Sequence, residues 1–154
     1  MKKHTILTLV AAIAAQLTIQ AADDHGHSHA AKAAGPNGGR LISSVEPHAE
    51  FLLTADRKIQ ITFVGDDGRP IAPDQQVVTV TTGDRSAPVK LTFVKAGDGL
   101  LSGQVVPEGQ NLPVVLQIKA SPDAKTVIEK FHLNLANCPG CNKAEYACTC
   151  EHGH

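Results

Sequence analysis

The chain lacks tryptophan altogether and has only one tyrosine and four phenylalanines among its 154 residues. Its core must therefore be built mainly from valine, leucine and isoleucine. Basic residues do not dominate either: the net charge is −1 at pH 7, and about −3 without Lys2 and Lys3, which belong to the export segment described below. Nucleic-acid binding is not expected, because it depends on clustered lysine and arginine that displace counterions.

Catalytic signatures are also missing. The sequence has no G-x-S-x-G, no H-E-x-x-H and no phosphate-binding glycine loop. The pair Gly38-Gly39 precedes an expected strand, so it lacks the helix dipole that would hold a phosphate. Carboxylates are scattered through turns and form no evident acid/base pair. We therefore expect a protein that is not an enzyme.

Residues 1–21 have the pattern of a cleaved signal peptide. Two lysines are followed by a mostly apolar run from Ile6 to Leu17, and residues 19–21 form an acceptable cleavage site. The apolar run is too short to span a membrane comfortably, and no cysteine follows it that could carry a lipid. We expect a periplasmic or secreted protein with no membrane anchor.

Residues 22–37 read as a flexible linker rich in histidine. Such a tract beside carboxylates has a metal-binding composition, although a solvated arm with incidental histidines is the alternative. Cleavage after Ala22 instead of Ala21 would place a histidine third from the new amino terminus, which suits square-planar Cu(II). The expected secondary metal ligands are His25, His27 and His29.

Residues 38–136 show the pattern of strands and turns throughout. Lys58–Phe63 and Val89–Phe93 alternate apolar and polar residues, and the turn sequence Gly97–Gly99 predicts a hairpin after the second of these strands. Seven or eight short strands predict an all-β fold, an antiparallel β-sandwich of immunoglobulin or cupredoxin-like type. The residues expected to be largely buried are Ile59, Ile61, Phe63, Leu91, Phe93, Val114, Leu116, Ile118, Phe131 and Leu133.

The start of this domain carries a resemblance. A histidine-rich lead-in is followed by Gly35–Leu41 (GPNGGRL), by His48–Phe51 (HAEF) and by a strand ending at Asp67–Pro70 (DGRP). This pattern resembles small exported β-sandwich proteins and a domain of the periplasmic adaptor subunits of heavy-metal efflux systems. The match covers about residues 25–70. It implies an extracytoplasmic metal-handling role, and a metal-efflux component as a partner, but the long coiled-coil and barrel regions of the adaptors are missing here.

Three residues of this domain are weak candidate ligands. His48 and Glu50 lie two apart on an expected strand, so they share a face and could chelate one ion, although a surface histidine beside a carboxylate is the commoner arrangement. His132 alternates out of phase with its apolar neighbours and should face solvent near the C-terminal tail.

The C-terminal tail, residues 137–154, contains all four cysteines of the chain and ends in two histidines. A C-x-x-C turn is followed by C-x-C-x-H-x-H, and thiolate with imidazole suits Zn(II) or Cu(I) rather than Mg(II) or Ca(II). The predicted metal ligands are Cys138, Cys141, Cys148, Cys150, His152 and His154. We expect this tail to lie outside the sandwich core.

Two other interpretations stay open. Four cysteines in an exported protein commonly form two disulfides, which would make the chain a stapled structural or interaction module. C-P-x-C also occurs at thiol–disulfide exchange sites, although there it normally opens a helix that the short spacer here cannot supply. The leading hypothesis is an exported metal-binding protein that buffers or relays a zinc or copper ion.

Overall fold

The structure is a computed structural model that describes residues 33–150. The expected signal peptide, most of the histidine-rich linker and the last four residues lie outside the described residues. So do five of the predicted ligands, namely His25, His27, His29, His152 and His154. Ten strands and one short 3₁₀ helix form the described part. Within residues 33–150, no helix is long and apolar enough to cross a membrane.

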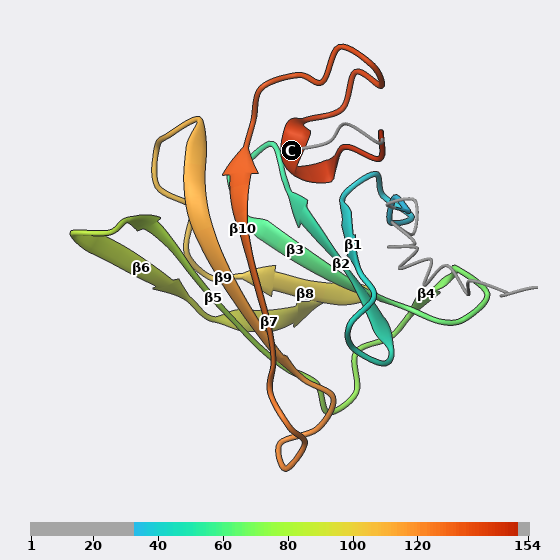
Figure 1. The fold of residues 1–154 in the computed structure, drawn as a ribbon. Helices are drawn as coiled ribbons and strands as arrows, with labels where there is room; N and C mark the ends of the chain where they lie inside the picture. Colours follow the sequence, from blue (N-terminus) through green and yellow to red (C-terminus); the bar gives the residue numbers. More distant parts are fainter. Residues whose placement is uncertain (1–32, 151–154) are drawn as a thin grey trace, which may run out of the picture.

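Two antiparallel sheets make up the fold (Figure 1). The first has six strands in the order β1-β2-β3-β8-β7, with β4 pairing with β3. Its strands are β1 (Arg40–Ile42), β2 (His48–Leu53), β3 (Ile59–Val64), β4 (Pro70–Ile71), β7 (Phe93–Ala96) and β8 (Gly99–Ser102). The second sheet has the order β10-β9-β5-β6. Its strands are β5 (Val77–Asp84), β6 (Ala87–Leu91), β9 (Asn111–Lys119) and β10 (Val127–Asn134).

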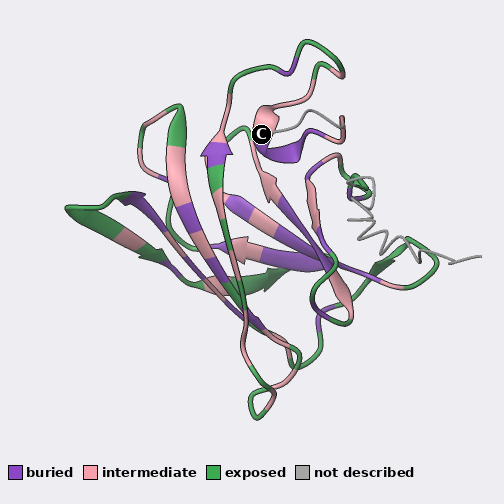
Figure 2. Cartoon of the chain, in the orientation of Figure 1, coloured by how far each residue is buried: buried purple, intermediate pink, exposed green. Residues whose placement is uncertain are grey.

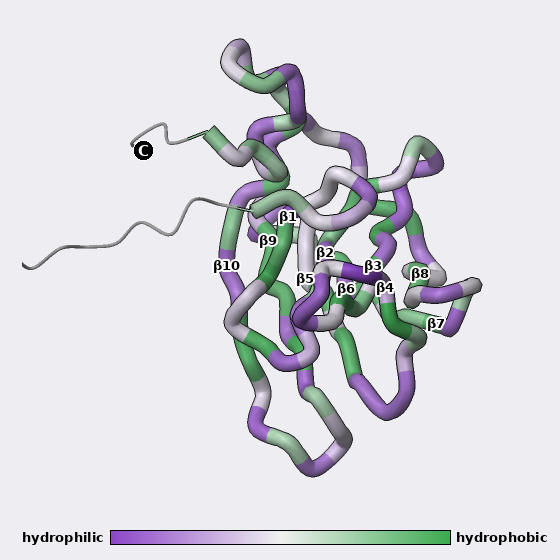
Figure 3. The backbone as a smooth tube through the Cα atoms, turned by 90° about the vertical axis from the view of Figure 1, so that its right-hand side faces the viewer, coloured by the Kyte–Doolittle hydropathy of each residue, from purple (hydrophilic) through white to green (hydrophobic). Residues whose placement is uncertain are grey.

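The core lies between the two sheets and is mostly aliphatic, as the scarcity of aromatic residues predicts. Eight of the ten residues expected inside are buried, with at most 2% exposure: Ile59, Ile61, Phe63, Leu91, Val114, Leu116, Ile118 and Leu133. Phe93 and Phe131 are half-buried and pack against this core. Buried and exposed residues alternate along several strands (Figure 2), and the turned view shows the matching change of hydropathy (Figure 3). The prediction of an all-β antiparallel sandwich is confirmed.

One predicted strand is divided between the sheets. Leu91 ends β6 in the second sheet, and Phe93 begins β7 in the first. Between them, the N–H of Thr92 donates to the side chain of Gln104 (3.0 Å), and its carbonyl accepts from the N–H of Gly103 (2.9 Å). Because the alternation of apolar residues continues through the crossing, the periodicity of Val89–Phe93 could not reveal it. The hairpin through residues 97 and 98 forms as expected, between β7 and β8.

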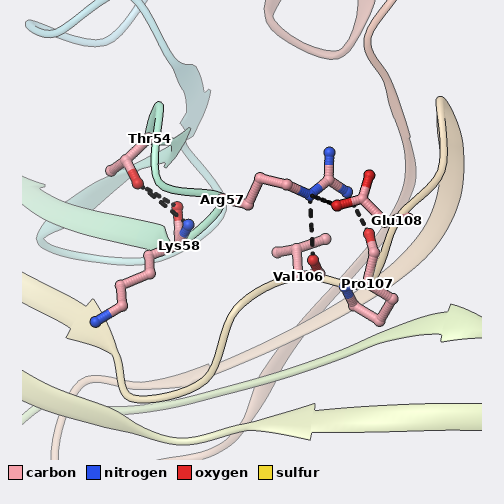
Figure 4. A network of polar contacts seen from close by, with 6 residues as sticks. All are labelled: Thr54, Arg57, Lys58, Val106, Pro107 and Glu108. Atoms are coloured by element: carbon pink, nitrogen blue, oxygen red, sulfur yellow. Dashed lines mark hydrogen bonds and ion pairs between the residues drawn. The ribbon is translucent and has the colours of Figure 1, made fainter.

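A polar network joins the β2–β3 turn to the long connection between β8 and β9 (Figure 4). Arg57 has a left-handed backbone (φ 56°), and its carbonyl accepts from the N–H of Val106 (2.7 Å). Its guanidinium donates to the carbonyls of Val106 (3.3 Å) and Pro107 and lies 3.5 Å from the Glu108 carboxylate. These contacts fix the loop that carries the buried Val106 into the core.

The loop Gly35–Gly39 wraps around the carboxylate of Glu50, which is fully buried. One oxygen accepts from the backbone N–H groups of Asn37 (2.9 Å) and Gly39 (2.7 Å), and the other accepts from the Asn37 side-chain amide (2.7 Å). The approach is too close for a side chain, since a Cβ at Gly35 would lie 2.4 Å from the Glu50 carboxyl carbon. The glycine-rich motif therefore serves to enclose a buried charge.

We expect Glu50→Ala to lower the free energy of unfolding by about 3 kcal/mol or more, because hydrogen bonds to a charged group are strong and their buried donors would be left unpaired. Glu50→Gln should cost less, about 1–2 kcal/mol, since one amide oxygen can still accept from both backbone N–H groups. Urea unfolding of the two variants measures the difference. Equal stability of Glu50→Ala and the unaltered chain would contradict a structural role for this carboxylate.

Candidate metal centre

The C-terminal tail folds back on the sandwich after β10. The N–H of Glu145 donates to the carbonyl of Ala136 (2.9 Å), and Asn137 pairs with Ala144 in an isolated antiparallel bridge. These contacts close a loop that contains the C-x-x-C motif. The tail is therefore an ordered part of the fold from residue 136 to residue 150 (Figure 1).

The C-x-x-C motif forms a tight knuckle. The carbonyl of Cys138 accepts from the N–H of Asn142 (2.9 Å), and the N–H of Cys138 donates to the carbonyl of Lys143 (2.8 Å). Asn142 has φ 56°, a left-handed conformation that asparagine tolerates better than most residues. The turn brings the side chains of Cys138 and Cys141 to the same side, as the motif predicts.

The second cysteine pair follows the 3₁₀ helix η1 (Glu145–Ala147). Cys148 caps this helix, with its N–H donating to the carbonyl of Glu145 (3.2 Å). The N–H of Cys150 donates to the Cys148 sulfur (3.3 Å). The spacer between the two pairs thus folds into a single short turn of helix that returns the chain to the knuckle.

The four sulfurs form one compact group, all within 4.8 Å of one another. The Sγ atom of Cys148 lies 3.3 Å from that of Cys138 and 3.7 Å from that of Cys141, and the sulfurs of Cys138 and Cys150 are 3.9 Å apart. Four sulfurs at the usual 2.3 Å from a central zinc would be separated by about 3.8 Å. The cluster therefore has the dimensions of a tetrahedral four-thiolate site.

No disulfide bond is formed among these four cysteines. Their closest contact, 3.3 Å, is far longer than a sulfur–sulfur bond of about 2.05 Å. Two disulfides would join the sulfurs as two bonded pairs. Here the sulfurs of the C-x-x-C motif and of the C-x-C motif lie together in one group. The arrangement can hold a metal ion.

Hydrogen bonds in and around the cluster shift the pKa values of three of its thiols in different directions. The backbone N–H of Lys143 is the main cause that lowers the pKa of Cys141 to about 7. Hydrogen bonding to Cys138 raises the pKa of Cys148, and hydrogen bonding to Cys141 raises that of Cys150 to about 12. Near neutral pH, Cys141 is thus the first thiolate available to an incoming cation.

Zinc binding should release protons and should weaken as pH falls. Cys148 and Cys150, with raised pKa values, each release close to one proton at pH 7, and Cys141, with a pKa of about 7, releases about half of one. We therefore expect zinc binding to release about 2.5 protons or more per zinc ion at pH 7. The affinity for zinc should rise steeply with pH. Calorimetry in buffers with different ionisation enthalpies counts these protons. Release of fewer than one proton would contradict binding by these thiols.

The three remaining predicted ligands within residues 33–150 make other contacts. Glu50 is enclosed by its loop, so its carboxylate is not free to chelate with His48, and that pairing is wrong. The Nδ1 atom of His48 lies 3.0 Å from the carbonyl of Val45. His132 is exposed, as expected, and its Nδ1 atom lies 3.1 Å from the side-chain oxygen of Asn111.

The expectation that the tail lies outside the core is also wrong. Tyr146 (7% exposed) and Ala147 (5% exposed) belong to the hydrophobic core, and η1 is coloured partly buried and partly intermediate in Figure 2. The ring of Tyr146 packs edge-on against Phe51, with centroids 6.1 Å apart, and its hydroxyl accepts from the N–H of Leu53 (3.1 Å). A lone aromatic residue between the two cysteine pairs was the only sequence signal for this anchor.

Comparisons with family models, with curated proteins and with solved structures found no significant match to this chain. The resemblance of residues 25–70 to exported metal-handling proteins therefore stays a prediction.

Proposed function

We propose that this chain is an exported protein that holds a soft transition metal in its C-terminal cysteine cluster and so buffers or relays that metal outside the cytoplasm. One observation carries the proposal: four thiols from two short motifs meet in a single group with the spacing of a tetrahedral site. Four thiolates in this geometry favour zinc, with Cu(I) as the second choice.

Several features of the site support a bound metal. Cys138 and Cys148 are buried, so an ion there would be shielded from water on one side. Backbone N–H groups point at the Cys141 and Cys148 sulfurs and would offset part of the negative charge of the thiolates. In an oxidising compartment, thiols at this spacing persist when a metal holds them.

Cobalt substitution and mass spectrometry test the proposal on the full chain purified under reducing conditions. Co(II) in a four-sulfur site should give intense sulfur-to-metal charge-transfer absorption and tetrahedral d–d bands, and the zinc-loaded chain should carry one ion per protein. Cys148→Ser should weaken zinc binding by about a hundredfold or more, because it removes a ligand that also lies closest to Cys138. Thr149→Ser, between two ligands, is the matched control and should bind normally.

A mass four hydrogens lower and free of metal, in protein taken directly from the periplasm, would support the stapled module instead. Insulin-reducing activity that Cys138→Ser abolishes would support a thiol–disulfide enzyme. Either result would replace metal binding as the primary function.

A further inference from the structure

A cavity of about 450 Å³ lies where β1 and β10, the edge strands of the two sheets, meet the tail. Helix η1 contacts both strands and contributes Tyr146 and Ala147 to the cavity wall. Arg40 lines the cavity from β1, and Glu129 lines it from β10. The metal centre described above uses neither of these charged side chains, so the cavity calls for an explanation of its own.

The guanidinium of Arg40 is held in place but is not fully hydrogen-bonded. It stacks over the Phe131 ring, 4.7 Å from the centroid, which fixes the plane of the group. Within residues 33–150 its buried Nε atom has no hydrogen-bond partner, and burial lowers the pKa of Arg40. An unpartnered buried donor is rare in a native protein. A planar guanidinium with donors along its edge matches a carboxylate, which can accept two parallel N–H bonds.

Glu129 brings a negative charge to the same cavity. It interacts electrostatically with Arg40, but in the described part of the chain the two side chains form no direct ion pair. One of its carboxylate oxygens accepts from the hydroxyl of Ser44, and the other oxygen can accept from a ligand. Glu129 would repel a simple anion, and Arg40 would repel a simple cation. A small molecule that carries both charges matches both side chains.

His48 adds a second acceptor to the wall. Its Nδ1 atom lies 3.0 Å from the Val45 carbonyl and 3.2 Å from a carboxylate oxygen of Glu46. Both neighbours can only accept, so the neutral ring carries its proton on Nδ1 and keeps an acceptor at Nε2. The cavity therefore offers acceptors for an ammonium group as well as donors for a carboxylate.

The remaining wall is partly apolar. Ile42, Tyr146 and Ala147 line the cavity and are at most 7% exposed, so they also belong to the hydrophobic core. An apolar side chain that packs against them would leave water and gain free energy in proportion to the area that it buries. A few converging polar groups beside an apolar wall are typical of sites for small molecules, and the volume falls in their usual range.

We propose that this cavity binds a free α-amino acid with an apolar side chain. Arg40 takes the carboxylate, and Glu129, with His48, takes the ammonium group. The side chain of the amino acid packs against Tyr146 and the other apolar residues of the wall. A free amino acid is the smallest common molecule that combines these three features. The inference goes beyond the proposed function, because it requires no metal at the cysteines.

Titration of the full mature chain with L-leucine, followed by amide nuclear magnetic resonance, tests the site. Leucine should shift the resonances of residues 40–44, 129–131 and 146–148 more than those of the β5–β6 hairpin. Two matched analogues are titrated in parallel: 4-methylpentanoate lacks the ammonium group of leucine, and 3-methylbutylamine lacks its carboxylate. Each analogue should bind about tenfold more weakly or worse, because it loses one charged hydrogen-bonding partner. An analogue that binds as tightly as leucine, or shifts that spare the cavity wall, would overturn the proposal.

Variants test the same point by affinity. Arg40→Gln and Glu129→Gln should each weaken leucine binding by about tenfold or more. Arg40→Lys should weaken it too, since lysine keeps the charge but lacks the planar fork. Glu129 lies outside the hydrophobic core, so Glu129→Gln still decides the question if Arg40→Gln does not fold. Lys130→Gln is the matched control, because Lys130 is exposed and alternates to the other face of β10. An unchanged affinity for leucine in Glu129→Gln would overturn the proposal.

The two proposals fail separately. The leucine titration is run on reduced protein with and without one equivalent of zinc, and the zinc content is measured. A chain that takes up no zinc disproves the metal function of the cysteine cluster, whereas its response to leucine still decides the cavity. Absence of leucine binding in both samples disproves the amino-acid site and leaves the result for zinc unaffected.

Discussion

Zinc should raise the melting temperature of the whole sandwich by roughly 10–20 °C, and removing it with a chelator should reverse the shift. The cysteine cluster is built on a segment that also fills the core, so its ligands stay together only while the tail is packed. A metal that binds the folded chain and not the unfolded one stabilises the fold by an amount set by its concentration and affinity. At a thousand times the dissociation constant, this amounts to about 4 kcal/mol.

The coupling follows from the position of η1. Tyr146 and Ala147 lie in the core, and the next residue, Cys148, is a predicted ligand with only 8% exposure. Unfolding of the sandwich would therefore separate Cys148 from the knuckle. A site on a freely moving tail would behave differently, since it could bind zinc in the folded and unfolded chain alike and would leave the melting temperature nearly unchanged.

Calorimetric scans with excess zinc, with chelator and with neither measure the effect. The variant in which all four cysteines are serine is the control, and zinc should not move its melting temperature. The expectation fails if zinc binds the unaltered chain tightly but leaves its melting temperature within about 2 °C, because the site is then independent of the fold.

Much of this architecture could be predicted from the sequence. Strict alternation in Lys58–Phe63 identified the central strand β3, and glycine with aspartate marked the turn between β7 and β8. The cysteine ligands were found because C-x-x-C and C-x-C have a restricted set of uses. These signals are local, so a single sequence is enough to carry them.

Contacts between distant residues could not be predicted in this way. The enclosure of Glu50 could not be predicted, because nothing in its own neighbourhood shows that the loop around Asn37 folds over it. The division of Val89–Phe93 between two sheets leaves the apolar alternation intact. The contacts by which Tyr146 anchors the tail could not be predicted either, because its partners Phe51 and Leu53 lie more than ninety residues earlier.

Removing the anchor should therefore destabilise the sandwich itself. Three of the five aromatic rings of the chain form one cluster: Phe51 in β2 packs edge-on against Phe131 in β10 at 5.1 Å and against Tyr146 at 6.1 Å. We expect Tyr146→Ala to lower the free energy of unfolding by about 3–5 kcal/mol, the usual cost of deleting a large buried ring. Tyr146→Phe keeps the ring and loses only the acceptor for the Leu53 N–H, so it should cost about 1–2 kcal/mol.

Urea unfolding of the metal-free, reduced chain measures both variants, so that the result reports packing and not ligand binding. Ile128→Ala is the control, because Ile128 is a large apolar residue on β10 but is 52% exposed; its change should stay within about 0.5–1 kcal/mol. If Tyr146→Ala costs no more than Ile128→Ala, the tail does not contribute to the core. With the expected loss, zinc affinity should also fall in Tyr146→Ala and hold in Tyr146→Phe, since the ion would then have to order the tail as it binds.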